Sequence, residues 1–203
     1  LVGLPEAVRT AAAEAAKAAG MEGKWLIGLQ NPSRIPFLQY SERRDLREKV
    51  YKAYIERGNN GNENDNKEIV LQIMKLRIEK ANLLGFETSA DFILDDTMAK
   101  KSDVVNSFLL DIFKAANEKA KAELAEMQAI ADREGNGVKV EAWDWDYYTE
   151  KVRQEKYAMS EDEIKPYFQM ENVRAGMFAL ANRLYGLNFE KMNNMPLFNP
   201  EAE

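Results

Sequence analysis

Apolar residues recur at spacings of three and four along most of this chain, and glycine stands where several of these runs stop. Such a spacing places apolar side chains on one face of an α-helix, and glycine readily adopts the left-handed conformation that ends one. The pattern therefore predicts helices over most of the 203 residues. We expect an all-α fold with at most one or two short strands.

Several stretches carry this periodicity between recognisable ends. A serine or threonine followed three residues later by an acid is typical of a helix start, and a glycine after the last apolar residue is typical of a helix end. The expected helices cover residues 4–19, 41–58, 65–84, 88–94, 102–134, 143–158 and 173–185. The expected capping residues are Ser41, Thr88 with Asp91, Asp144, and Ser160 with Glu163.

Two short stretches favour extended backbone instead. Residues 25–29 are apolar, and the two prolines that follow, Pro32 and Pro36, disfavour a helix there. Residues 138–140 are the second candidate strand. No repeat and no long linker interrupts the chain, so we expect one helical segment, residues 1–203, without an internal domain boundary.

The longest expected helix, residues 102–134, changes character along its length. Its second half is richer in charge, which indicates that one face there meets solvent. Its first half is mostly apolar, and we expect the following side chains to be buried: Val105, Phe108, Leu109, Ile112 and Phe113.

The composition contains no histidine and no cysteine, and these two zeros exclude several kinds of chemistry. Without cysteine there is no disulfide, no iron–sulfur cluster and no thiol nucleophile. Without histidine there is no imidazole for a catalytic triad, and the usual nitrogen ligand of zinc is missing. Only oxygen ligands remain, which suit calcium or magnesium far better than zinc.

Other function classes lose support as well. The net charge is −6 and the basic residues are scattered among acidic ones, which disfavours nucleic-acid binding. The sequence contains no GxSxG, P-loop or GxGxxG motif. It has no run of about 20 apolar residues, so we expect no membrane span. Because Leu1 is not an initiator methionine, we expect the chain to begin inside a longer polypeptide or after processing.

The most biased stretch is the Asn- and Gly-rich segment at residues 57–66. Alternate oxygen side chains there resemble a calcium loop, but Asp65 stands where that loop needs glycine and Leu71 where it needs glutamate. A turn between helices, with Asp65 or Asn66 capping the next one, is the simpler interpretation. A loop this polar is also a candidate to line a substrate groove.

Aromatic residues surround two carboxylates in the segment Trp143-Asp144-Trp145-Asp146-Tyr147-Tyr148. Acids two residues apart point to different sides of a helix, so they form a poor general-acid and general-base pair. Core aromatics beside a helix cap are the simpler interpretation. Ring faces next to carboxylates are nevertheless suited to hold a peptide.

Short segments in collinear order across nearly the whole chain resemble the thimet-oligopeptidase family of zinc metallopeptidases, most closely its bacterial peptidyl-dipeptidase (dipeptidyl carboxypeptidase) branch. The resemblance rests on the segments GLP at residues 3–5, NPSR at 31–34, PFL at 36–38, REKVYKAY at 47–54, RGNNG at 57–61, DNKEI at 65–69, ANLLGF at 81–86, MAK at 98–100, WDWDYY at 143–148, KPYF at 165–168 and LYG at 184–186.

The resemblance implies a mostly helical ellipsoid cut by a deep channel, with one zinc ion held by an H-E-x-x-H helix and a downstream glutamate. In that chemistry the metal polarises the scissile carbonyl and activates water, and the motif glutamate is the general base. This chain stops at Glu203 without that motif, so no catalytic or metal-binding residue can be carried over to it.

We therefore expect the chain to be the N-terminal-side channel-wall portion of a larger zinc peptidase that releases C-terminal dipeptides from short peptides. On this view zinc belongs to the parent enzyme, the chain alone is inactive, and exposed apolar faces favour its self-association. The alternative is a non-enzymatic helical scaffold. We expect a cytoplasmic location, with the periplasm or cell envelope as the alternative. The candidate channel residues are Asn59, Asn60, Asn62, Trp143, Asp146 and Tyr147.

Overall fold

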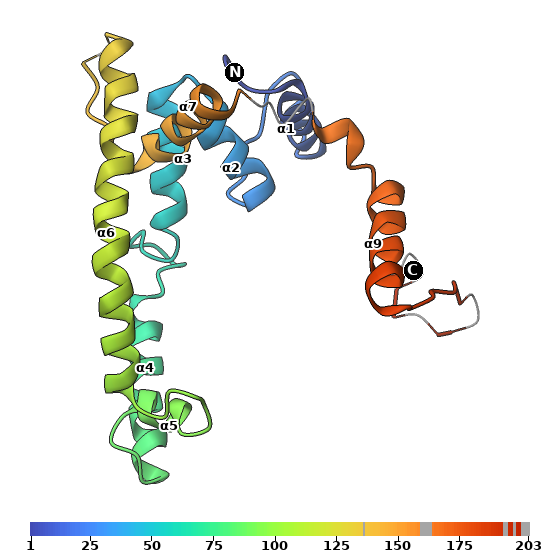
Figure 1. Cartoon of the computed structure of the whole chain (residues 1–203). Helices are drawn as coiled ribbons and strands as arrows, with labels where there is room; N and C mark the ends of the chain where they lie inside the picture. Colours follow the sequence, from blue (N-terminus) through green and yellow to red (C-terminus); the bar gives the residue numbers. More distant parts are fainter. Residues whose placement is uncertain (136, 159–163, 193–194, 197, 200–203) are drawn as a thin grey trace. The chain divides into compact units, whose positions relative to one another are not determined.

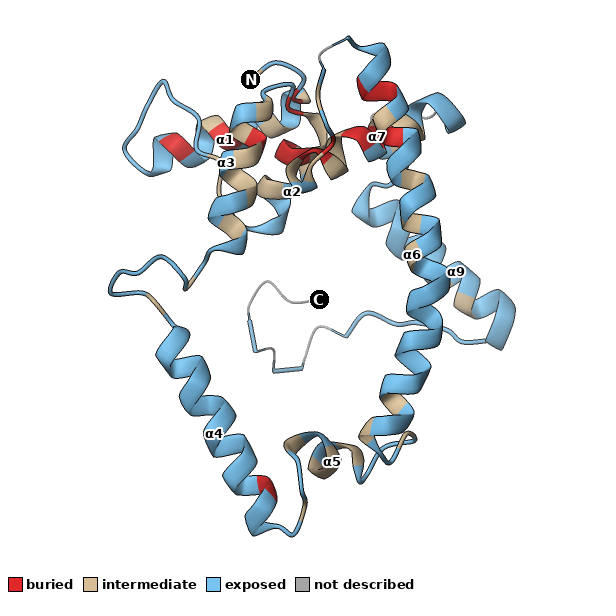
Figure 2. Ribbon diagram, turned by 90° about the vertical axis from the view of Figure 1, so that its left-hand side faces the viewer, coloured by how far each residue is buried: buried red, intermediate tan, exposed pale blue. Residues whose placement is uncertain are grey.

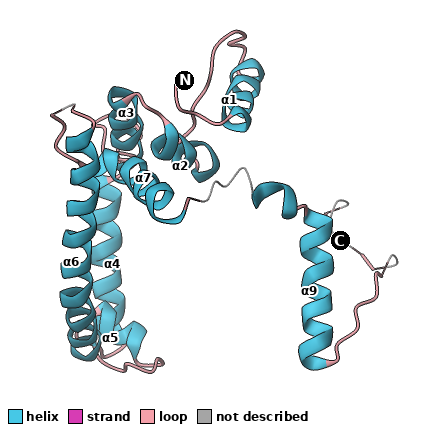
Figure 3. Cartoon of the chain, turned by 45° about the horizontal axis from the view of Figure 1, so that its top comes forward, coloured by secondary structure: helices cyan, strands magenta, loops and turns pink. Residues whose placement is uncertain are grey.

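The computed structural model describes residues 1–135, 137–158, 164–192, 195–196 and 198–199. Within this part of the chain every regular element is helical and none is a strand (Figure 3), which confirms the expected all-α class. The structure divides into two compact units, Leu1–Lys156 and Tyr157–Glu203, although the sequence marks no boundary there.

The helices follow the order of the sequence (Figure 1). The first unit holds α1 (Glu6–Ala18), α2 (Asn31–Tyr40), α3 (Arg44–Ile55), α4 (Lys67–Leu83), α5 (Ser89–Leu94), α6 (Ser102–Arg133), the 3-10 turn η1 (Ala142–Asp144) and α7 (Trp145–Tyr157), whose last residue belongs to the second unit. The second unit holds the 3-10 turn η2 (Lys165–Tyr167) and α9 (Met170–Tyr185). Every expected helix is present, and α2 is an addition.

The expectation that Pro32 and Pro36 prevent a helix is wrong, because α2 contains both of them. Pro32 lies in the first turn, where its missing N–H would be unpaired anyway. Pro36 removes one internal hydrogen bond, but the two residues after it, Phe37 and Leu38, are each 2% exposed. The burial of these two side chains offsets the lost hydrogen bond, an effect of packing that local preferences do not contain.

The two stretches expected to be extended are not helical, and neither pairs as a strand within the described residues. Other groups satisfy their backbones. The Leu26 amide donates to the Ala12 carbonyl of α1 at 2.9 Å. On the other stretch, the Gln128 side chain accepts from the Val140 amide at 2.9 Å and donates to the Val138 carbonyl at 2.8 Å. The Gln128 side chain of α6 thus makes the two backbone hydrogen bonds that a neighbouring strand would otherwise make.

The expected caps are confirmed at some helix ends and not at others. The Thr88 hydroxyl accepts from the Asp91 amide at 3.1 Å at the start of α5, and Gly186 ends α9 in the left-handed conformation with φ of 68°. Ser41 is not the N-cap of α3, which begins after Arg43. Asp144 is not an N-cap. It occupies the N3 position of the capping box in which Glu141 is the N-cap. The expected box of Ser160 with Glu163 lies outside the described residues.

Most of the buried residues gather in one part of the first unit (Figure 2). In this part α1 packs on α2, α2 on α3, and α3 on η1. The last turns of α6 close a hydrophobic cluster with the residues before and within α7, formed by Met127, Ile130, Ala131, Val140 and Tyr148. This cluster and the Asp144 contacts described below hold the aromatic segment against α3.

The first half of α6 is not buried as expected. Phe108, Leu109, Ile112 and Phe113 are between 51% and 64% exposed, and Val105 is half-buried. The only substantial packing partner of this end of α6 among the described residues is α5, which in turn packs on α4. An apolar face predicts a packing partner, and the described part of the chain covers only a small part of this face.

Candidate functional site

Three charged side chains fasten the aromatic segment to α3. Asp144 is fully buried, and its carboxylate accepts from Arg47 Nη2 at 2.7 Å and lies 2.9 Å from Arg44 Nη2. Arg47 is 2% exposed and also donates to the Ser41 carbonyl at 2.6 Å. A buried carboxylate is tolerated only with such partners. The triad therefore fixes where residues 143–148 stand relative to α3.

Trp143, directly before Asp144, is half-buried. The edge of its ring system meets Tyr51 of α3 with centroids 6.5 Å apart, and two cations, Arg44 and Lys52, lie 5.4 Å and 5.2 Å from its centroid. Its indole nitrogen is buried and finds no hydrogen-bond partner among the described residues. Buried indole N–H groups usually have an acceptor, and this donor has none within the described part of the chain.

Two cations lie close to the ring of Tyr147. The guanidinium of Arg47 lies 4.1 Å from the ring centroid and the ammonium of Lys151 lies 4.6 Å from it. Tyr148 meets the Tyr147 ring edge-on at 5.2 Å and belongs to the hydrophobic cluster. The Tyr147 ring is thus fixed by electrostatic and aromatic contacts while remaining half-buried.

Asp146 is a half-buried carboxylate whose nearest charged influence comes from α2. Burial raises the pKa of Asp146, and the positive charge of Arg34 opposes part of that rise. The Arg34 guanidinium stacks 3.6 Å from the Tyr54 centroid and donates to the Asn31 side chain at 2.8 Å. Its Nε is buried without a partner among the described residues. A carboxylate and an incompletely satisfied guanidinium therefore occur in the same region.

The Asn- and Gly-rich segment is a turn that is bonded to itself, as the simpler interpretation expects. Asp65 accepts from the Gly61 amide at 2.8 Å and from the Lys67 amide at 3.0 Å, and its carboxylate lies 2.8 Å from Lys67 Nζ. These bonds lower the pKa of Asp65 to about 2. Gly58 has φ of 72°, and a Cβ there would lie 2.8 Å from the Asn66 side-chain nitrogen. The turn therefore needs glycine at that position.

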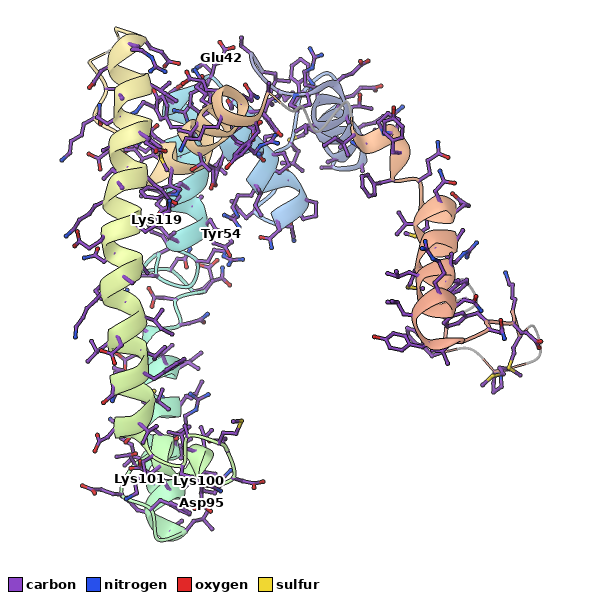
Figure 4. All side chains as sticks on the ribbon, in the orientation of Figure 1. Glu42, Tyr54, Asp95, Lys100, Lys101 and Lys119 are labelled. Atoms are coloured by element: carbon purple, nitrogen blue, oxygen red, sulfur yellow. The ribbon has the colours of Figure 1, made fainter. Side chains whose placement is uncertain are left out.

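The candidate residues in this turn differ in how far their side chains are engaged. Asn59 accepts from Lys67 Nζ at 3.0 Å, and Asn62 accepts from the Asn64 amide at 3.1 Å. Asn60 is exposed. The turn follows the end of α3, where Tyr54 stands on the last turn of the helix (Figure 4).

The structure thus brings Trp143, Asp146 and Tyr147 together beside α2 and α3, and it leaves the three asparagines in a separate turn after α3. Sequence reasoning did not identify Arg34, Arg44 and Arg47 as members of this region. The signal that could have found Arg44 and Arg47 is a pair of arginines three positions apart on the buried side of a helix.

No group of three or more acidic, histidine or cysteine side chains in the described ranges could hold a metal ion. The whole sequence has neither histidine nor cysteine. The residues that the structure describes therefore do not fit a zinc site. The described helices also include none with the length and apolar content that a membrane crossing needs.

Comparisons with known proteins agree with one another. Residues 37–202 match Peptidase family M3. The whole chain aligns with the dipeptidyl carboxypeptidase of Escherichia coli K12 at 36% identity and with that of Salmonella typhimurium LT2 at 38%, covering 30% of the length of each. It also aligns over its full length with oligopeptidase A of Salmonella typhimurium at 35% identity, again over 30% of that protein.

The matches also reach eukaryotic proteins. An organellar oligopeptidase A of Arabidopsis thaliana is 34% identical over 98% of this chain and 26% of its own length. The chain spans less than a third of the length of the relatives named here. The peptidases of the matched family are zinc metallopeptidases, and no group of side chains able to hold a metal ion occurs among the residues of this chain for which the structure gives positions. The family match covers most of the chain, and several relatives are more than 30% identical along all of it, so the chain belongs to Peptidase family M3.

Proposed function

We propose that this chain is the N-terminal-side channel-wall portion of a metallopeptidase that hydrolyses short oligopeptides and releases C-terminal dipeptides. The observation that carries the proposal is the alignment of the entire chain, without a long unmatched stretch, to two proteins named dipeptidyl carboxypeptidase. Oligopeptidase A relatives align almost as well, so peptide hydrolysis is the broader part of the proposal and dipeptide release is its narrower part.

The aromatic segment supplies chemistry that suits a peptide. The half-buried rings of Trp143 and Tyr147 offer apolar faces for the side chains of a peptide. The Asp146 carboxylate is an acceptor for a backbone amide or a cationic side chain. In the turn after α3, Asn60 offers both a donor and an acceptor, and Asn59 and Asn62 hold the turn in shape.

In such an enzyme, the residues that bind the zinc ion would lie in the part of the longer protein outside this chain. When bound, zinc polarises a carbonyl and activates water. The residues described here would bind and orient the peptide and exclude bulky folded substrates. They would not take part in bond cleavage.

The test compares the longer protein with the 203-residue chain on peptides that have a blocked N-terminus. The longer protein should contain zinc, release dipeptides from a free C-terminus, and lose this activity when the C-terminus is amidated. The isolated chain should show neither zinc nor cleavage. Cleavage that ignores amidation would contradict dipeptide release while keeping the peptidase. Absence of any cleavage by the zinc-loaded longer protein would favour the scaffold alternative.

The isolated chain should also self-associate, because many large apolar side chains on α4, α6 and α9 are exposed. Sedimentation of the isolated chain over a range of concentrations tests this. A chain that stays monomeric at the highest concentration would contradict it.

A further inference from the structure

Helix α4 exposes apolar side chains around more than half of its circumference. Its exposed apolar side chains are 43% to 80% accessible, and six of them mark the extent of the surface: Leu83, Leu76, Ile73, Val70, Met74 and Leu71. Because each residue advances about 100° around the helix axis, these six positions span an arc of about 240°. A surface helix typically shows an apolar stripe only somewhat wider than about 100°.

The rest of the α4 circumference is polar. Glu68, Gln72, Lys75, Glu79 and Asn82 fall within an arc of about 80° at the same angular step. We call this set the polar stripe of α4. Among the described residues, only the short helix α5 packs substantially on α4. Ala81 is the one described residue of α4 that is buried. Figure 2 shows α4 exposed along nearly its whole length.

Three basic residues fall within the apolar arc. Lys67 pairs with Asp65, and the Lys80 ammonium lies 5.1 Å from the Phe92 ring centroid, which leaves Arg77. Arg77 projects at an angle between those of Ile73 and Val70, and no carboxylate of the described residues lies within ion-pair distance of it. A guanidinium that becomes covered together with the apolar residues around it needs an acidic partner or backbone carbonyls. A surface that covers this arc should therefore be apolar and should place an acceptor beside Arg77.

We propose that further segments of the same longer polypeptide cover both flanks of α4, leaving only the polar stripe in contact with water. This inference rests on the proposed function, in which the chain is part of a longer enzyme. Two observations favour these segments over a second copy of the chain. A symmetric contact between two copies covers one side of a helix, whereas the arc exceeds half the circumference. The relatives are also more than three times as long as this chain, because it covers only 30% of them.

The absence of cysteine from the chain allows a direct test by thiol labelling. Single substitutions Ile73→Cys and Leu71→Cys sit well apart on the apolar arc, and Glu79→Cys on the polar stripe is the matched control. Each is made in the longer protein and in the isolated chain, the latter at low concentration. Reaction with N-ethylmaleimide is followed by mass spectrometry of the α4 peptide.

Both arc positions should react at least about 100-fold more slowly in the longer protein than in the isolated chain, because a covered thiol reacts only after local opening. The Glu79→Cys control should react at similar rates in both. Slow exchange of the α4 amides in the unsubstituted longer protein would support the same conclusion without a substitution.

Rapid labelling of either arc position in the longer protein would overturn the proposal, and so would a shielded Glu79→Cys. Shielding that disappears on dilution would also overturn it, since that behaviour identifies a second copy as the cover. The outcome is separable from the proposed function. Peptidase activity with an unshielded α4 contradicts only this inference, whereas a shielded α4 in a protein without activity contradicts only the proposed function.

Discussion

The guanidinium of Arg47 donates to the carboxylate of Asp144, 97 positions later in the chain, at 2.7 Å, and both side chains are buried. This contact ties α3 to η1 and so to the start of α7. Arg44 completes the triad from the solvent side, since its side chain is 36% exposed. The Asp144 carboxylate, together with the hydrophobic cluster, therefore sets the position of the aromatic segment.

Replacing Asp144 with alanine should therefore destabilise the protein strongly. The change leaves the Arg47 guanidinium buried without its carboxylate, and breaking a buried pair in this way costs about 3–5 kcal/mol of unfolding free energy. The double variant Arg47→Met with Asp144→Leu should lose much less, because it removes both buried charges. Asp45→Ala, which breaks the exposed pair with Arg43, is the control and should have little effect. Urea unfolding measures all three, and equal losses for Asp144→Ala and Asp45→Ala would contradict the role of the triad.

Asp146→Asn should stabilise the protein at neutral pH. Burial raises the pKa of Asp146 above its ordinary value of 3.8, so the folded state holds the proton more tightly than the unfolded state does. Stability from this group is present below the unfolded pKa and falls as pH rises through the folded pKa. The uncharged amide of the Asp146→Asn variant does not ionise, so this loss of stability with rising pH disappears. Arg34→Gln should raise the pKa of Asp146 further, because the arginine charge opposes the rise. Unfolding curves between pH 3 and 7 compare the variants, and an unchanged pH dependence in Asp146→Asn would refute this assignment.

Alanine at Asn60, Asp146 or Tyr147 in the longer enzyme should raise KM for short peptides. The loss of one hydrogen bond of about 0.5–1.5 kcal/mol corresponds to an increase of about 2- to 10-fold. Glu118→Ala on the charged face of α6 is the control. Peptide kinetics at saturating and limiting substrate separate KM from kcat. If all three variants keep the KM of the unsubstituted enzyme, the turn and the aromatic segment are scaffold.

Gly3→Ala should cost more stability than Gly20→Ala. Both glycines have positive φ, 86° and 73°, so either substitution introduces the strain of a left-handed alanine, about 1–2 kcal/mol. At Gly3 the new Cβ would also clash with the Tyr40 carbonyl oxygen, whereas nothing lies within 4 Å at Gly20. Thermal unfolding of the two variants isolates this clash. Equal shifts in Tm would show that the N-terminal segment does not pack on the end of α2 in solution.

Local signals in the sequence were enough to predict most helices and some of their ends. Thr88 and Gly186 act within one turn of the chain, so their effect can be seen from neighbouring residues alone. The helix at α2 was missed because the burial of Phe37 and Leu38 outweighs the presence of Pro36. That outcome depends on α1 and α3, which the local pattern does not contain.

The candidate site was predictable only in part, for the same reason. The aromatic segment stands out by composition, but its link to α3 joins residues about a hundred positions apart, and nothing in the spacing indicates that pair. The exposure of Phe108 and Phe113 was not predictable either, since an apolar pattern shows what a helix face prefers and not what is present to meet it.

Helix α6 is 32 residues long, which corresponds to about 48 Å of rise, and its hydrophobic cluster engages only residues between Met127 and Ala131. The helix is therefore packed into the hydrophobic cluster only near its C-terminal end. A bend of a few degrees close to these packed residues moves the N-terminal end of α6, next to α5, much further than it moves the turns near Gln128. In the isolated chain, motion should consequently grow steadily from the anchored turns toward Ser102.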